Sequence, residues 1–180
     1  KALPDPYHEA LAPCLADHPP RPLSELRELL RTALGQDPDR IFASIETKPL
    51  GAASVGQVHR GTLHDGTAVA IKVRYPDVKQ LFPIDVADLL KLTKRFAPSS
   101  YDAMVGWAEV LLLELDLSRE ARLMSLGHDA LARVAPGISV PRPLQELCRE
   151  NVLVMTLVEG QTLQEGLLQV ERAAASRQGL

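Results

Sequence analysis

Lys72 is the residue whose position most strongly suggests chemistry, because it follows an apolar run in an expected strand. Strand alternation places Lys72 on one face with Ala68 and Ala70, and the bulkier valines and isoleucine on the other. A planar apolar ring could lie on this shallow floor while its phosphate reaches the lysine. The alternative interpretation is an edge-strand lysine that blocks aggregation.

Four small residues, Gly51, Ala52, Ala53 and Ser54, form a loop between two strands that are expected to pair. Small side chains let a backbone fold closely over a ligand, and glycine-rich turns bind phosphate because their N–H groups converge on the anion. Only one of the four is glycine, and a tight corner beside packed helices is the alternative. The pattern of these four residues leaves both interpretations open.

Three carboxylates follow in a leucine-rich segment. Glu114 lies in a stretch that is apolar nearly all round, which predicts a buried helix, and a buried carboxylate needs a partner. Lys72 is the expected partner. Asp116 and Glu120 are four residues apart and would share a helix face. They could bind a cation, or be held by a neighbouring arginine.

A fourth feature is the apolar run that ends at Gly160. It predicts a strand followed by a connector, in which the backbone from Thr156 to Val158 could hydrogen-bond the edge of an adenine. An ordinary strand and turn is the alternative.

The elements that would position these residues indicate an α+β domain with an antiparallel sheet. The pair Asp65-Gly66 predicts a tight hairpin turn. The expected strands are 45–50, 55–63, 67–73, 138–143 and 151–158. The expected helices lie near the N-terminus, at 24–34, 85–96 and 101–126, and from 163 to the end.

Composition excludes several classes of function. The chain has 180 residues and a formal net charge of −3, which gives no general attraction to nucleic acid. Cys14 and Cys148 lie far apart and are interpreted as reduced thiols, and the five histidines lack metal-ligand spacing. We find no membrane-spanning run and no targeting segment. Because the chain begins at Lys1, we expect it to be a piece of a longer protein.

Together these motifs resemble the UbiB (aarF-domain) family of atypical protein-kinase-like proteins. The strand lysine motif V-A-I-K is present at 69–72, and K-V-x-x-P is present as KVRYP at 72–76. The alanine-rich loop motif appears as GAASVGQVH at 51–59, which includes Gln57. The E-x-D motif appears as ELD at 114–116, followed by E-A at 120–121, and the connector strand appears as NVLVMTLVEG at 151–160.

The resemblance implies a protein-kinase-like N-lobe, with an antiparallel five-stranded sheet, added N-terminal and long helices, and a missing C-lobe. Residues 1–44 would be a family-specific helical extension, 45–160 the lobe, and 161–180 the start of a truncated C-lobe helix. The family's catalytic loop and metal-binding motif belong after Gly160, and residues 161–180 contain neither. We therefore assign no catalytic residue and no metal ligand to this chain. The family's K-x-G-Q motif is also absent, and Gly51 replaces an alanine.

The resemblance further implies that the chain binds ATP or ADP with Mg²⁺. Lys72 would contact phosphates and pair with Glu114, residues 51–54 would lie over the phosphates, and the 156–158 backbone would hold the base. Family members are linked to ubiquinone (coenzyme Q) biosynthesis or lipid homeostasis, which implies a mitochondrial location with plastid or bacterial membranes as alternatives. It also implies a lipid or quinone-precursor ligand and peripheral membrane association.

The alternative function is a pseudokinase-like module that binds lipid or protein without phosphotransfer. A kinase for a small soluble metabolite is a third interpretation, which the QVH and ELD motifs at 57–59 and 114–116 disfavour.

Overall fold

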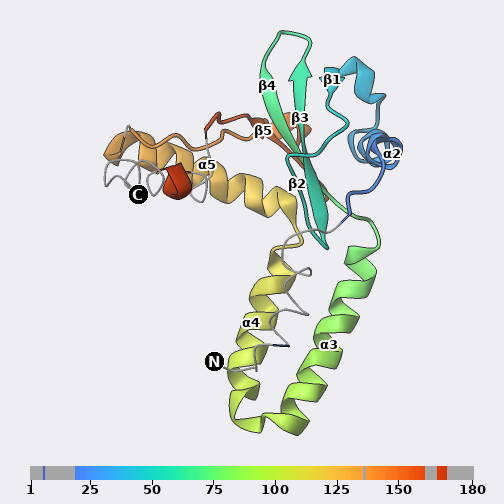
Figure 1. The fold of residues 1–180 in the computed structure, drawn as a ribbon, viewed down its shortest axis with the longest axis vertical. Coiled ribbons are helices and arrows are strands. Elements are labelled where there is room, and N and C mark those ends of the chain that lie inside the picture. Colours follow the sequence, from blue (N-terminus) through green and yellow to red (C-terminus); the bar gives the residue numbers. More distant parts are fainter. Residues whose placement is uncertain (1–5, 7–18, 136, 161–165, 170–180) are drawn as a thin grey trace, which may run out of the picture.

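The computed structural model describes residue 6 and residues 19–135, 137–160 and 166–169 (Figure 1). The helix expected nearest the N-terminus and most of the last helix lie outside the described residues. The described helices and strands, in chain order, are α2 (Leu23–Leu34), β1 (Phe42–Ile45), β2 (Gly51–Ala52), β3 (Gly56–Leu63), β4 (Ala68–Arg74), α3 (Val78–Phe96), α4 (Tyr101–Leu113), α5 (Leu117–Val134) and β5 (Val152–Thr156).

The strands form one five-stranded antiparallel sheet, which confirms the predicted α+β class. Strand order is β1-β3-β4-β5, and the short β2 also pairs with β3. The register aligns Gly51, Val58, Lys72 and Leu153 in one row across four strands. Residues opposite one another in a sheet point to the same side, so this row fixes which side chains share the lysine's face.

Helix α2 covers the face of the sheet opposite Lys72 (Figure 1). Its apolar stripe buries Leu26 and Leu30 against the alternate residues of β4 and β5. The predicted bulky core face of β4 is thereby confirmed, and its residues Val69, Ile71 and Val73 are 0–1% exposed.

Helix α5 packs on the other face of the sheet, the face that carries Lys72. Leu117 and Ala121 form a second buried cluster with Leu153 of β5 and Cys148, a free thiol. The sheet is therefore a middle layer between two helices, and α5 is the helix that can supply side chains to Lys72.

Helices α3 and α4 form a hairpin that extends away from one end of the sheet (Figure 1). It buries few side chains: Val78, Val86 and Thr93 in α3, and Ala108 in α4. Many large apolar side chains stay exposed, including Ile84, Leu92, Phe96, Trp107 and Val110. In the part of the chain that the structure describes, no helix is long and apolar enough to cross a bilayer.

Four predicted elements were wrong in detail. The helix expected at 85–96 starts earlier, at Val78. The strand expected at 45–50 is replaced by β1, which ends at Ile45, and the two-residue β2. The segment 138–143 is not a strand, and only Pro143 forms an isolated bridge, with Met155. The long helix expected at 101–126 is two helices, because Asp116 takes an extended conformation and caps α5 instead of continuing α4.

Candidate functional site

Lys72 lies at the centre of the sheet row described above, on the face covered by α5. Its Nζ atom donates to both carboxylate oxygens of Glu120, at 2.8 and 2.7 Å. The two side chains are 35% and 28% exposed, so the pair lies at the edge of the interior. This arrangement holds an ammonium group in a fixed place while leaving part of it accessible.

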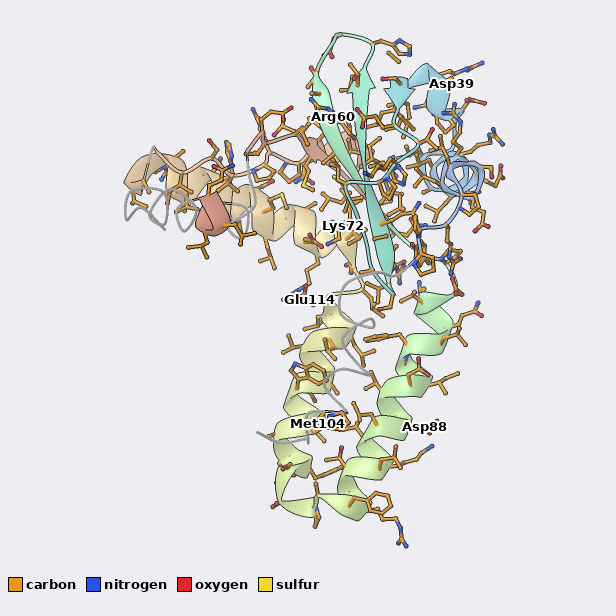
Figure 2. All side chains as sticks on the ribbon, viewed as in Figure 1. Asp39, Arg60, Lys72, Asp88, Met104 and Glu114 are labelled. Atoms are coloured by element: carbon orange, nitrogen blue, oxygen red, sulfur yellow. The ribbon has the colours of Figure 1, made fainter. Side chains whose placement is uncertain are left out.

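The predicted Lys72–Glu114 ion pair was wrong. Glu114 ends α4, its side chain is 62% exposed, and its carboxylate lies 4.0 Å from Arg119 Nη1 (Figure 2). The expected pairing fails because α4 and α5 are separate helices. Helix α5 begins at Leu117, and its direction places Glu120, next to the buried Ala121, toward the sheet. The signal in the sequence was the capping pair Asp116 and Ser118, which marks a helix start.

Asp116 serves as the N-cap of α5. Its carboxylate accepts hydrogen bonds from the Ser118 N–H at 2.9 Å and the Ser118 hydroxyl at 2.5 Å, and Arg122 lies 3.8 Å away. The bond from the Ser118 hydroxyl holds the pKa of Asp116 below its ordinary value. Asp116 and Glu120 therefore bind different partners. Among the described residues, no group of three or more His, Cys, Asp or Glu side chains is placed to hold a metal ion.

The small-residue loop is fixed to the strand that carries Lys72. The Ala53 N–H donates to the Gly56 carbonyl at 2.8 Å, and the Tyr75 N–H donates to the Val55 carbonyl at 3.0 Å. A Cβ atom on Gly56 would lie 2.1 Å from the Val73 carbonyl oxygen, so only glycine fits there. Gly51, Ala53 and Ser54 are exposed, and Ala52 is half-buried.

A cavity of about 190 Å³ lies where this loop meets the junction of α4 and α5. The sheet contributes two cations to its wall, Lys72 and Arg74, and the junction contributes one carboxylate, Glu114. Its lining residues are Val55, Gly56, Lys72, Val73, Arg74, Glu114, Leu115 and Leu117.

The connector after β5 has used some of its backbone groups already. The Thr156 N–H donates to the Arg142 carbonyl at 2.9 Å, and the Leu157 N–H donates to the Ala68 carbonyl at 3.0 Å. Val158 is 43% exposed and makes no hydrogen bond to another described residue. Of the two predicted base-binding positions, Val158 is the one whose N–H remains available.

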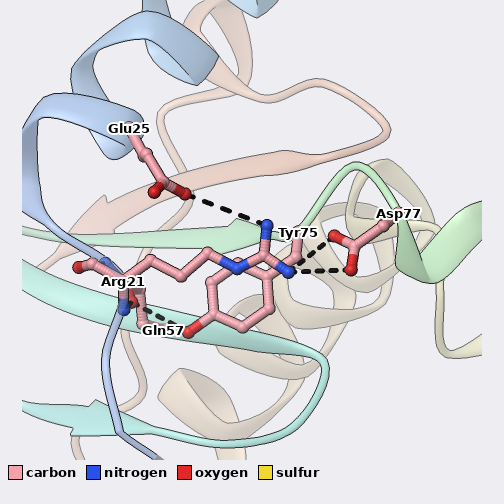
Figure 3. Close-up of polar contacts among 5 residues, drawn as sticks. All are labelled: Arg21, Glu25, Gln57, Tyr75 and Asp77. Carbon is pink, nitrogen blue, oxygen red and sulfur yellow. Dashed lines mark hydrogen bonds and ion pairs between the residues drawn. The ribbon is translucent and has the colours of Figure 1, made fainter.

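Sequence reasoning named Gln57 but missed its partners. Its side-chain oxygen accepts from the Arg21 N–H and from the Tyr75 hydroxyl, both at 2.8 Å (Figure 3). Its amide nitrogen donates to the Arg21 carbonyl at 3.2 Å and lies 2.9 Å from Nε2 of the buried His59. This network lies on the α2 face of the sheet, away from Lys72.

Arg21 completes this network from the segment that leads into α2. Its guanidinium lies over the Tyr75 ring, 4.0 Å from the centroid, and donates to both carboxylate oxygens of Asp77 at 2.7 and 2.8 Å (Figure 3). The residues before α2 are thereby joined to the sheet and to the start of α3. No sequence pattern pairs Arg21 with Asp77, since 56 residues separate them.

A protein-family model and the named relatives all indicate an atypical kinase-like domain. The chain matches the ABC1 atypical kinase-like domain over residues 15–179. It is 38% identical over 153 residues to the rat (Rattus norvegicus) protein named Atypical kinase COQ8B, mitochondrial, covering 81% of this chain and 28% of that protein. It is 34% identical over 164 residues to AarF domain-containing protein kinase 1 of Mus musculus, covering 88% of this chain and 31% of that protein.

A yeast relative and a solved structure agree. Atypical kinase COQ8, mitochondrial, of Saccharomyces cerevisiae is 31% identical over 165 residues, or 89% of this chain and 33% of that protein. The Rv3197–erythromycin complex from Mycobacterium tuberculosis has a TM-score of 0.60 and 28% identity, covering 91% of this chain and 43% of that one. The chain thus spans 28% to 33% of the length of these three named relatives. Because the domain match covers most of the sequence, this protein belongs to the UbiB (aarF-domain) family of atypical kinase-like proteins.

Proposed function

We propose that this chain is the nucleotide-binding lobe of an atypical kinase or ATPase, and that it binds ATP or ADP with Mg²⁺. The observation that carries the proposal is the Lys72–Glu120 ion pair beside the small-residue loop, which is followed by Gly56, a position with no room for a side chain. A lysine held by a helix carboxylate is the arrangement that kinase-like proteins use to bind nucleotide phosphates.

In this proposal the phosphates lie between the 51–54 loop and Lys72, and the base reaches the backbone at Val158. The loop supports this arrangement because its tight turn is tied to β4 by the bond from Tyr75 to Val55. The chain would supply cationic and backbone groups for the phosphates. Since the described residues contain no carboxylate or histidine cluster for a metal, the ligands of Mg²⁺ would come from the phosphates and from a catalytic lobe.

The names of the relatives suggest a setting. COQ8B and COQ8 are both named mitochondrial atypical kinases. We propose, on this likeness, a role in mitochondrial ubiquinone (coenzyme Q) biosynthesis or lipid homeostasis, with a lipid or quinone precursor as a second ligand. Peripheral membrane association belongs to the same proposal.

A thermal-shift measurement on the full-length protein tests nucleotide binding. Mg²⁺-ATP and Mg²⁺-ADP should raise the melting temperature by several degrees, and Lys72→Ala should remove most of that rise. The matched control is Lys91→Ala, because Lys91 is an exposed lysine on the α3–α4 hairpin that pairs with Asp88. An unchanged shift in Lys72→Ala would contradict the proposal.

The second candidate function is a pseudokinase-like module that binds lipid or protein without phosphotransfer. The exposed apolar side chains of the α3–α4 hairpin favour it, because unpartnered apolar surface of this kind marks interaction sites. If the full-length protein binds nucleotide but transfers no phosphate and hydrolyses no ATP, this second function is the better description.

A further inference from the structure

Arg74 is a buried cation with unused hydrogen-bond donors. It lies two residues after Lys72 on β4 and therefore shares its face of the sheet. Its side chain is 6% exposed, and its one ion pair with a described residue is to Glu150, with Nη2 3.3 Å from the carboxylate. Its Nε and Nη1 atoms are buried and have no hydrogen-bond partner among the described residues.

Buried hydrogen-bond donors without a partner are unfavourable, so the unused donors of Arg74 require an explanation. The Glu150 carboxylate is shared between two cations, because it also accepts a hydrogen bond from Lys79 Nζ at 3.0 Å. The bond from Lys79 is the main reason that the pKa of Glu150 lies below its ordinary value.

Arg74 belongs to the lining of the cavity beside the loop. Lys72, Val55 and Gly56 line the same cavity. Its volume of about 190 Å³ is several times the roughly 30 Å³ that a water molecule occupies in the liquid. A guanidinium group in such a place binds oxyanions through paired N–H donors, which neutral ligands cannot match.

We propose that Arg74, with Lys72, forms a subsite for one phosphoryl group beside Val55 and Gly56, where the chain leaves the small-residue loop and enters β3. Lys72 is committed to Glu120, whereas Arg74 has donors to spare, so Arg74 is the principal anchor. The phosphoryl group can be the end of a nucleotide's phosphate chain or a free phosphate. The nucleotide source rests on the proposed function, and the free phosphate does not.

Glu114 provides a sharp internal test because it lines the same cavity. If the cavity receives an anion, the Glu114 carboxylate repels it, and Glu114→Gln should tighten phosphate binding. The alternative is that Glu114 turns into the cavity and forms an ion pair with Arg74. In that case Glu114→Gln should leave phosphate binding unchanged or weaker and should destabilise the unliganded protein.

The experiment is calorimetric titration of the full-length protein with inorganic phosphate, pyrophosphate, Mg²⁺-ATP and adenosine. Arg74→Met should weaken phosphate and pyrophosphate binding at least tenfold, while the unliganded melting temperature stays the same or rises because two buried donors without a partner are removed. Arg74→Lys should bind with intermediate affinity. The matched control is Lys79→Met, which removes a cation from the same Glu150 but not from the cavity, and it should bind phosphate within twofold of the wild type.

The four titrations distinguish failure of this phosphoryl subsite from failure of the proposed nucleotide site. If adenosine and Mg²⁺-ATP bind equally well to wild type and Arg74→Met, and neither protein binds phosphate, the subsite is refuted and the proposed function stands. If phosphate binding depends on Arg74 while no nucleotide binds, the subsite stands and the proposed function fails. Phosphate binding that survives in Arg74→Met also overturns the subsite.

Discussion

Both faces of the sheet bury polar side chains, but the two faces differ in how many of the buried polar groups have a hydrogen-bond partner. On the α2 face, the Gln57 amide is saturated, since its oxygen accepts two hydrogen bonds and its nitrogen contacts two further acceptors. On the α5 face, Arg74 keeps two buried nitrogens without a partner among the described residues. A network in which every buried polar group has a partner is typical of a structural role. Buried donors without a partner, in a side chain that lines a cavity, are typical of a ligand site.

The family motif at 51–59 is divided by this difference. Gly51 to Ser54 and Gly56 belong to the loop on the Lys72 side. Gln57 and His59 point to the α2 side, where Gln57 bonds Arg21 in the segment before α2 and His59 contacts the Gln57 amide. His59 Nδ1 lies 2.7 Å from the Glu46 carbonyl, which can only accept, so Nδ1 carries the proton and Nε2 accepts from Gln57. One half of this short motif thus forms a structural network, and the other half lies in the proposed ligand site.

The largest expected effect comes from breaking the closed network. Gln57→Leu keeps the volume of the side chain but leaves the Tyr75 hydroxyl, the His59 Nε2 atom and the Arg21 N–H unsatisfied. We expect the free energy of unfolding to fall by about 3–5 kcal/mol, because each buried group left unpaired costs roughly 1–3 kcal/mol. Urea unfolding followed by circular dichroism measures this change.

The control for Gln57→Leu is Gln80→Leu, since Gln80 is exposed on α3. That substitution should change the free energy of unfolding by no more than about 0.5 kcal/mol. If Gln57→Leu proved as mild as the control, the α2 face would not hold a cooperative network and the contrast between the two faces would fail.

Much of this contrast was accessible from the sequence, and the limit is physical. Alternation in β4 correctly separated Lys72 from the valine face, and the Asp65-Gly66 turn was correctly placed, with Gly66 at a φ of +88°. These features depend on neighbours along the chain. The ion-pair partner of Lys72 depends on where one helix ends and the next begins. Because Asp116 caps α5, the partner is Glu120 and not the predicted Glu114.

The role of Arg74 was not predictable at all. Its partner Glu150 lies 76 residues away in the sequence. A strand pattern shows that Arg74 shares a face with Lys72. It cannot show that the donors of Arg74 remain unpaired, because that depends on every element that surrounds it.

An intermediate effect is expected from the cap that redirects Glu120. Asp116→Ala removes the acceptor of the Ser118 N–H and should lower the free energy of unfolding by about 1 kcal/mol. Since folding lowers the pKa of Asp116, its stabilisation is complete at neutral pH and is lost as the pH falls through and below the ordinary carboxyl value of 3.8.

Urea unfolding at pH 7 and at several acidic values checks this dependence. The difference between wild type and Asp116→Ala should be largest at pH 7 and shrink in acid. Asp129→Ala, an exposed position later in the same helix, should show no such trend. A difference that stayed constant with pH would mean that the Asp116 charge does not cap α5.

The smallest effect on stability, and the sharpest one for the comparison, is expected from Glu120→Gln. The Lys72–Glu120 pair is about one-third exposed, so its loss should change the free energy of unfolding by less than about 1 kcal/mol. The same substitution should remove most of the thermal shift produced by Mg²⁺-ADP, because Lys72 loses the carboxylate that orients it. Gln57→Leu should do the reverse, with a large loss of stability and a retained shift in the molecules that fold. If Glu120→Gln instead unfolded the protein, Lys72 would be a structural residue, and both faces of the sheet would serve the same end.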